Sequence, residues 1–175
     1  MAKVSSDQIY LDEKKVLDEL RKNAKESIDI IAKKCKFSRQ KVWRIIKRLE
    51  KNKTIWGYPA VLDDEKQDLN MFIVLIKKTN LPINEQLADT IIGRKIEKLV
   101  PNSRVSIINT LYVHGTYDWI ISFVAEDIKE AKKFCETLNR IYQGYIEELN
   151  LLETLFPVRK QGILNPGVQK LKEYL

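Results

Sequence analysis

The chain of 175 residues carries 31 basic and 24 acidic side chains, for a net charge of +7, and 44 % of its residues are hydrophobic. That hydrophobic content is enough for a buried core, which excludes a disordered chain. No apolar run approaches the roughly 20 residues of a membrane span. The first residues also lack the hydrophobic stretch of a signal peptide, so we expect a cytoplasmic protein without membrane contact.

The positive charge is concentrated in the first third of the chain. Residues 1–63 contain 16 basic and 9 acidic side chains, whereas residues 64–175 contain 15 of each. Residues 33–53 alone hold ten basic side chains and a single acid, Glu50. A basic block beside an electrically balanced remainder predicts a module that binds a polyanion, joined to a second domain.

Apolar residues spaced three and four positions apart predict three helices within the first 52 residues. We expect Asp12 to be the N-cap of the first helix, which ends near Asn23. Ser27 and Ser38 are the expected N-caps of the next two helices. The apolar faces of the three helices are Leu11, Val16, Leu17 and Leu20, then Ile28, Ile31, Ala32 and Cys35, then Val42, Ile45, Ile46 and Leu49.

The second and third predicted helices are separated by only two or three residues, which is the spacing of a helix-turn-helix. Ala32 is small enough for the two helices to cross closely. At Lys36 the backbone has to become left-handed, a conformation for which glycine is usual. A larger residue there costs about 1–3 kcal/mol, so we predict a strained turn.

The exposed face of the third predicted helix carries no acidic residue, which favours DNA binding over a plain helical hairpin with a solvated basic face. The first turns of a recognition helix enter the major groove. The side chains that can pair with base edges are therefore Arg39, Gln40, Lys41 and Arg44. The candidates for phosphate contacts are Ser38, Trp43, Lys47, Arg48, Lys51 and Lys53. Trp43 either packs against the first helix or lies along the sugar-phosphate edge.

The pattern changes after Asn52. Residues 54–62 predict a β-like segment, which Gly57 and Pro59 restrict to an edge strand or a linker. The polar residues 63–68 follow. We therefore expect a helix-turn-helix domain at residues 1–63, a second domain at residues 64–156 and a tail at residues 157–175.

The second domain alternates strands and helices. Strands are predicted at residues 71–76, 105–113, 119–125 and 149–156, with helices at residues 84–99 and from Asp127 onward. Asp127 and Glu130 resemble a capping box, and residues 114–118 have the length of a hairpin connection. The order βαββαβ predicts an α+β, ferredoxin-like unit. In the tail, Asn165 and Pro166 predict the start of a short helix.

Apolar residues fall on both faces of the predicted strands, whereas two helices can cover only one face of a sheet. The residues that we assign to the two faces are Phe72, Val74, Ile107, Ile121 and Phe123. We therefore expect the bare face to be buried against a second copy of the chain. Such a homodimer presents two recognition helices about one turn of DNA apart.

Few residues point to catalysis or to metal binding. Cys35 and Cys135 lie on apolar stripes and are expected to be buried, reduced thiols. His114 is the single histidine and has no Cys or His partner, so we expect no metal and no cofactor. The loop that contains Gly115 and Asp118 has two interpretations. It is either simple turn chemistry or a site where backbone amides and the Asp118 carboxylate engage the two ends of a ligand.

Two groups of motifs resemble the Lrp/AsnC (leucine-responsive, feast/famine) family of transcriptional regulators. The first group lies in the N-terminal half: Leu11-Asp12, residues 23–27, Ile31-Ala32, Ser38, residues 48–50 and residues 55–58. The second is the run His114, Gly115, Thr116, Tyr117 and Asp118, which resembles the Gly-x-Tyr-Asp signature of that family's ligand-sensing RAM domain. Together they cover roughly residues 9–156. Lys36, residues 52–53 and the tail depart from the family pattern.

This resemblance implies a regulator that binds double-stranded DNA, dimerises through its sheets, often assembles into octamers and binds a small amino acid at residues 114–118. Two alternatives remain. One is an architectural protein that wraps DNA without an effector. The other is an enzyme like the siroheme decarboxylases of similar architecture, which the basic recognition helix and the single histidine disfavour.

Overall fold

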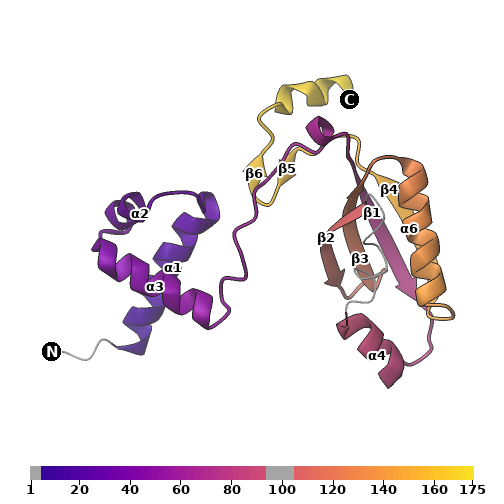
Figure 1. Ribbon diagram of the computed structural model, residues 1–175, viewed down its shortest axis with the longest axis horizontal. Coiled ribbons are helices and arrows are strands. Elements are labelled where there is room, and N and C mark those ends of the chain that lie inside the picture. Colours follow the sequence, from indigo (N-terminus) through magenta and orange to yellow (C-terminus); the bar gives the residue numbers. More distant parts are fainter. Residues whose placement is uncertain (1–4, 94–104) are drawn as a thin grey trace. The chain divides into compact units, whose positions relative to one another are not determined.

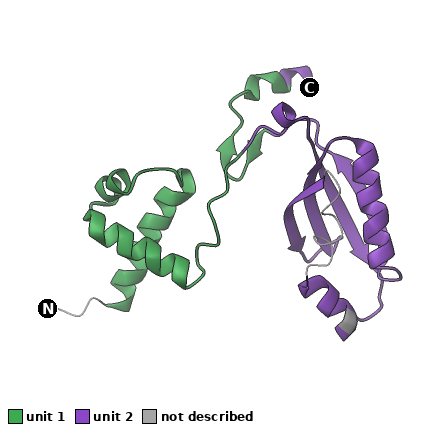
Figure 2. Cartoon of the chain, viewed as in Figure 1, with its two compact units in different colours: residues 1–61, 158–171 green, residues 62–157, 172–175 purple. Residues whose placement is uncertain are grey.

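The computed structural model describes residues 5–93 and 105–175 (Figure 1). The chain forms two compact units (Figure 2). The first consists of residues 1–61 and 158–171, and the second of residues 62–157 and 172–175. No helix within the described residues is long and apolar enough to cross a membrane.

Three helices make up the body of the first unit: α1 (Ser6–Lys22), α2 (Ile28–Cys35) and α3 (Arg39–Lys51). Each is capped by a serine hydroxyl that accepts a hydrogen bond from a backbone N–H three residues later, at Ser5, Ser27 and Ser38. The buried core consists of Val16, Ile31, Ala32, Cys35, Val42, Ile45 and Leu49. The caps and apolar faces predicted for the second and third helices are therefore confirmed.

The predicted start of the first helix is wrong. The helix begins at Ser6, and Asp12 lies inside it. The Asp12 side chain accepts a hydrogen bond from Gln8 Nε2 at 2.9 Å and lies 2.6 Å from Lys41 Nζ. Asp12 is only 4 % exposed and one turn from Val16, so it belongs to the buried face of α1 and cannot cap it.

The turn between α2 and α3 has the backbone that the sequence predicts. Lys36 is left-handed, with φ 56° and ψ 44°, and the N–H of Phe37 donates to the carbonyl oxygen of Ala32 at 2.9 Å. Lys53 is also left-handed, with φ 62°. The resemblance predicts glycine at or next to both positions. The backbone is nevertheless left-handed at Lys36 and Lys53, the conformation for which glycine is usual.

The β-like segment predicted at residues 54–62 is not a strand. These residues have no regular secondary structure and form a linker, followed by the short 3-10 helix η1 (Glu65–Gln67). Trp56 is 94 % exposed. Of the two interpretations that Gly57 and Pro59 allow, an edge strand or a linker, the linker is the one that forms.

The tail forms a two-stranded hairpin and a short 3-10 helix: β5 (Arg159–Lys160), β6 (Ile163–Leu164) and η2 (Val168–Glu173). The predicted tail helix therefore starts three residues late. The Asn165 side chain accepts a hydrogen bond from the N–H of Gly167 at 2.8 Å and holds a turn before the helix. The hairpin was not predicted.

The second unit is a four-stranded antiparallel sheet in the order β2-β3-β1-β4. Its elements are β1 (Asn70–Lys78), α4 (Glu85–Ile92), β2 (Val105–Tyr112), β3 (Trp119–Ala125), α6 (Ile128–Ile141) and β4 (Ile146–Glu153). This order confirms the predicted α+β, ferredoxin-like fold. β4 begins and ends three residues earlier than predicted, in the register of its pairing with β1. Residues 94–99 of the predicted helix lie outside the described residues.

The assignment of apolar residues to the two sheet faces is corrected by the strand register. Phe72 pairs with Phe123 and with Ile107 through β3, and Val74 pairs with Ile121. All five residues therefore lie on one face, where they pack with Leu87 of α4 and with Ala131, Phe134 and Leu138 of α6. The opposite face carries other residues: Met71, Ile73, Leu75, Ile120, Ser122 and Val124. That open face is also mostly apolar.

Candidate nucleic-acid interface

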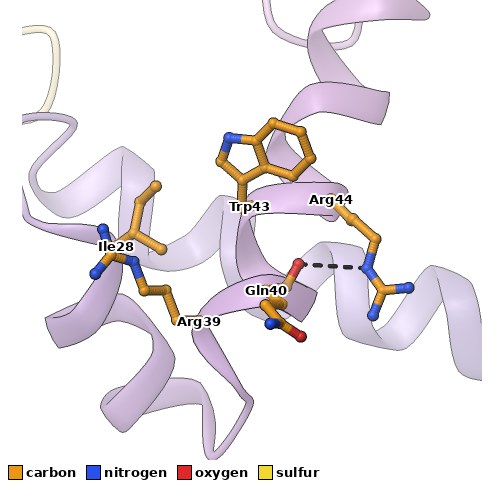
Figure 3. Close-up of a pocket in the computed structure, with 5 residues that line it drawn as sticks. All are labelled: Ile28, Arg39, Gln40, Trp43 and Arg44. Atoms are coloured by element: carbon orange, nitrogen blue, oxygen red, sulfur yellow. Dashed lines mark hydrogen bonds between the residues drawn. The ribbon is translucent and has the colours of Figure 1, made fainter.

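The side of α3 opposite its buried residues presents a basic and aromatic surface. Arg39, Gln40, Trp43 and Arg44 line a cavity of about 410 Å³, together with Ile28 at the start of α2 (Figure 3). Arg44 Nε donates to the backbone carbonyl oxygen of Gln40, one turn earlier, at 3.4 Å. The structure thus brings three of the four predicted base-edge residues together, with Trp43 half exposed among them.

The fourth predicted base-edge residue, Lys41, is placed differently. Its ammonium forms an ion pair with Asp12 of α1 and lies 4.0 Å from the centre of the Phe37 ring. The hydrogen bond from Lys41, together with one from Gln8, lowers the pKa of Asp12, although burial of the carboxyl opposes this. Lys41 therefore joins α1 to α3, because its side chain is held by a buried carboxylate.

Three other cations of α3 form ion pairs at the surface. The pairs are Arg39–Asp29 at 3.5 Å, Lys47–Glu50 at 2.8 Å and Arg48–Glu13 at 2.7 Å. The cationic side chains keep between 47 % and 70 % of their surface exposed. Exposed pairs of this kind contribute little to stability, so a phosphate group can replace the carboxylate at small cost.

The remaining phosphate candidates are exposed. Lys51 ends α3, and Lys53 follows it in the left-handed turn. The Ser38 hydroxyl accepts a hydrogen bond from the N–H of Lys41 at 3.2 Å. Its main role is therefore to cap α3, which fixes where the first turn of that helix begins.

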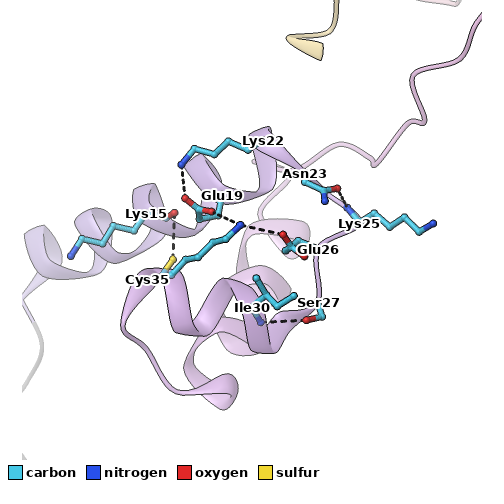
Figure 4. Close-up of polar contacts among 10 residues, drawn as sticks. Lys15, Glu19, Lys22, Asn23, Lys25, Glu26, Ser27, Ile30 and Cys35 are labelled. Carbon is cyan, nitrogen blue, oxygen red and sulfur yellow. Dashed lines mark hydrogen bonds and ion pairs between the residues drawn. The ribbon is translucent and has the colours of Figure 1, made fainter. Parts of the chain in front are cut away.

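A second polar cluster holds α2 against α1 (Figure 4). Lys34 Nζ lies 3.4 Å from a carboxylate oxygen of Glu19 and 3.1 Å from one of Glu26. The Cys35 thiol donates to the carbonyl oxygen of Lys15 at 3.6 Å, and burial raises the pKa of this thiol. These contacts orient the helix that precedes the recognition helix, and Cys35 serves as a packing residue.

The residues predicted to bind an effector lie in the connection between β2 and β3. His114, Gly115 and Thr116 are exposed. Asp118 Oδ2 accepts a hydrogen bond from the N–H of Lys78 at 2.9 Å, and the N–H of Asp118 donates to the carbonyl oxygen of Ile76 at 2.9 Å. Asp118 therefore anchors the hairpin to β1, as turn chemistry requires.

Tyr117, in the same connection, is tied to the edge strand on the other side of β1. Its hydroxyl accepts a hydrogen bond from Asn150 Nδ2 of β4 at 3.1 Å. Asp118 therefore joins the loop to β1, and Tyr117 joins it to β4, the strand next to β1. This leaves residues 114–116 as the exposed part of the predicted effector loop.

Sequence reasoning missed the contribution of Asp12 and Phe37 to the position of α3. One signal for Asp12 was present, since residues 12, 16 and 20 are spaced by four and lie on one side of a helix. Burying a carboxylate on an apolar stripe is costly unless a cation on a neighbouring helix pairs with it. The partner could not be chosen from the sequence, because many lysines lie nearby in the chain.

Comparison with known proteins gives a consistent result. Residues 13–55 match a family model described as winged helix-turn-helix DNA-binding. An AsnC family transcriptional regulator from Agrobacterium tumefaciens superposes with a TM-score of 0.62 at 18 % identity, over 94 % of this chain and 98 % of that one. No curated protein matches the chain in sequence.

Two further solved structures have the same architecture. LrpC of Bacillus subtilis gives a TM-score of 0.59 at 18 % identity, over 90 % of this chain and 99 % of that one. A transcriptional regulator of Neisseria meningitidis in complex with L-methionine gives 0.64 at 15 % identity, over 90 % and 94 %. A helix-turn-helix unit followed by a ferredoxin-like sheet is thus an architecture that bacterial transcriptional regulators use. The chain has the fold of the Lrp/AsnC regulators, which confirms the resemblance seen in its motifs.

Proposed function

We propose that this protein is a sequence-specific, DNA-binding transcriptional regulator. The observation that carries the proposal is the outward face of α3, where Arg39, Gln40 and Arg44 line one cavity and the single acidic contact among the described residues is the exposed pair of Arg39 with Asp29. The match of residues 13–55 to a DNA-binding family supports it, as does the fold shared with transcriptional regulators. A recognition helix with this face fits the major groove by its first turns.

The roles along α3 follow from its direction in such a groove. Arg39, Gln40 and Arg44 lie in the first two turns and contact base edges, by the pairing of Arg with guanine and of Gln with adenine. Phosphates are bound further along, by Lys47, Arg48, Lys51 and Lys53. Lys41 is not among the base-reading residues, because Asp12 holds its ammonium.

We further propose that residues 64–156 assemble two copies of the chain through the open face of the sheet. That face is lined by Met71, Ile73, Leu75, Ile120 and Val124, and Leu111 and Leu152 on it are 51 % and 47 % exposed. Met71, Ile73, Leu75 and Ile120 are half-buried and Val124 is buried, so the apolar groups that this face exposes most are the leucines on its two edge strands. Exposed apolar side chains on a sheet face that α4 and α6 do not cover are typical of a contact between subunits. Residues 1–63 then bind DNA in a pairwise arrangement, and tetramers or octamers are further assemblies of the dimer.

A small amino acid is the proposed effector, bound at residues 114–118. The Neisseria meningitidis regulator in complex with L-methionine supports this chemistry. L-methionine is accordingly the first ligand for calorimetric titration, followed by the other amino acids. A ligand that binds at the loop is expected to change operator affinity, and operator DNA is expected to change ligand affinity by the same factor. Absence of heat for all twenty at millimolar concentration contradicts an effector role for this loop.

The proposed function is tested by selecting bound fragments from genomic DNA and measuring affinity for selected and scrambled duplexes over a range of salt concentrations. A sequence-specific regulator is expected to prefer selected DNA by about 10³-fold or more. A ratio near one at every salt concentration would instead identify an architectural DNA-wrapping protein. No binding to either duplex at low salt would contradict DNA binding altogether.

A further inference from the structure

Trp43 is an exposed aromatic residue in the middle of the outward face of α3. The side chain is 51 % accessible and lies beside Ile28, between Arg39 on one side and Gln40 and Arg44 on the other (Figure 3). The core of the unit is complete without it, because other residues of α3 fill that core. Because the Trp43 indole is exposed to solvent on the face proposed to contact DNA, we expect it to pack against a group of the bound DNA.

The position of Trp43 along the helix places it on the base-reading stripe. It follows Arg39 and Gln40 by four and three residues, so its side chain lies over the same side of the helix. The polar groups of base edges in the major groove match Arg39, Gln40 and Arg44. The apolar group that those edges display is the 5-methyl group of thymine.

We propose that Trp43 and Ile28 form an apolar pocket for thymine methyl groups, so that Trp43 determines a preference for thymine at the bases that face it. This inference rests on the proposed function, since it requires α3 to lie in the major groove. It assigns to Trp43 a role in sequence recognition. A Trp43 that lay along the sugar-phosphate edge would bind all sequences alike.

Uracil differs from thymine only by the missing 5-methyl group, which makes it the appropriate probe. A duplex selected from genomic DNA is prepared in two forms, with thymine and with deoxyuridine at every thymine position. The affinity of the full-length protein is measured for both. Each buried methyl group is expected to favour the thymine form by about four-fold. In Trp43→Ala the ratio of the two affinities is expected to fall toward one, because Ile28 alone covers less of the methyl groups.

The matched control is Trp56→Ala, which removes an indole that is 94 % exposed in the linker. It is expected to keep the wild-type ratio. Circular dichroism verifies that both variants melt like the wild type, and Trp43→Phe, which retains an aromatic ring, is expected to keep part of the preference. This variant keeps the test decisive if Trp43→Ala does not fold.

The outcomes separate this inference from the proposed function. A wild-type ratio of one, or a ratio that Trp43→Ala leaves unchanged, overturns the role of Trp43 while DNA binding stands. Equal weakening of both duplexes in Trp43→Ala, with the ratio unaltered, assigns the indole to the sugar-phosphate edge and also overturns it. Failure of the wild type to bind either duplex contradicts the proposed function itself.

Discussion

Asp12 and Lys41 illustrate how a single buried contact changes the role of a residue on the recognition helix. Lys41 is one of ten cations in a 21-residue block, and its position in the first turn of α3 favours base contact. In the structure, the Lys41 ammonium instead pairs with the carboxylate of Asp12, a residue that is 4 % exposed. The same ammonium lies over the ring of Phe37. The pair joins α1 to α3 and sets the position of the first turn of the recognition helix.

We expect Asp12→Asn to lower the free energy of unfolding by about 1–2 kcal/mol at neutral pH, because Lys41 loses its anionic partner but remains partly solvated. The folded-state pKa of Asp12 lies below its ordinary value of 3.8. The contribution of the pair is therefore present above that pH and is lost as the pH falls through the lowered pKa. Urea unfolding between pH 7 and pH 2 measures this difference.

The control for this prediction is Asp18→Asn, an exposed carboxylate on the same helix. Its unfolding free energy is expected to stay within about 0.5 kcal/mol of the wild type. If Asp12→Asn were as stable as the control at neutral pH, the pair would have no part in joining the two helices.

Arg44 and Lys47 are expected to differ in how their removal affects DNA binding. Arg44→Ala should relax preference at one base position, at a cost of about 1–3 kcal/mol. Lys47→Ala should weaken all sequences alike and reduce the slope of log K against log salt by about 0.9 for each phosphate that the lysine no longer neutralises. Titration of selected and scrambled duplexes at several salt concentrations separates the two effects. Lys132→Ala, an exposed cation on α6, is the control, and identical behaviour of the two α3 variants would refute the division of roles.

At the scale of the element, the turn between α2 and α3 keeps its geometry in spite of its residue. Lys36 is left-handed at φ 56°, and the hydrogen bond from the N–H of Phe37 to Ala32 holds the turn closed. The surrounding helices determine this conformation, since an isolated lysine disfavours it. The strain is local and should be removable without any change in the fold.

Lys36→Gly is therefore expected to stabilise the protein by about 0.5–1 kcal/mol, because glycine adopts this backbone conformation without the clash of a Cβ atom. Thermal melting measures the change. Lys33→Gly, on the exposed side of α2, is the matched control and is expected to destabilise by about 1 kcal/mol, as glycine does inside a helix. Destabilisation by both variants would mean that the Lys36 side chain contributes more than its backbone costs.

At the scale of the whole molecule, the open face of the sheet is the apolar surface that a monomer leaves exposed to solvent. Leu111 pairs with Ile120 on that face and is 51 % exposed, so a charge there need not disturb the folded unit. Leu111→Glu is expected to convert the proposed dimer into a folded monomer. Sedimentation at micromolar concentration, with circular dichroism as a test of folding, measures this.

Tyr112→Glu is the matched control, because Tyr112 is the next residue of β2, is 70 % exposed and faces the opposite side of the sheet. It is expected to remain dimeric. A wild-type protein that sediments as a monomer contradicts the proposed assembly, as does a Leu111→Glu variant that stays dimeric.

The sequence by itself determined the features that depend on neighbouring residues. Ser27 and Ser38 cap helices because a hydroxyl reaches the N–H groups of the next turn, and Lys36 takes the left-handed conformation between two helices only a few residues apart. The βαββαβ order follows from local periodicity in the same way. These signals lie within a few residues of the structure that they specify, which is why they can be found without coordinates.

The tertiary structure decided the features that depend on which distant residues meet. Asp12 has the sequence position of a cap, but α3 brings Lys41 beside it. Residues 54–62 have a strand-like sequence but form a linker without regular secondary structure. Alternation along each strand puts Phe72 and Val74 on one face, and likewise Ile121 and Phe123, whereas only the register that pairs Phe72 with Phe123 shows that the two pairs share the same face. Alternation along one strand gives two faces without saying which of them the helices cover, because that choice is made by contacts between elements far apart in the chain.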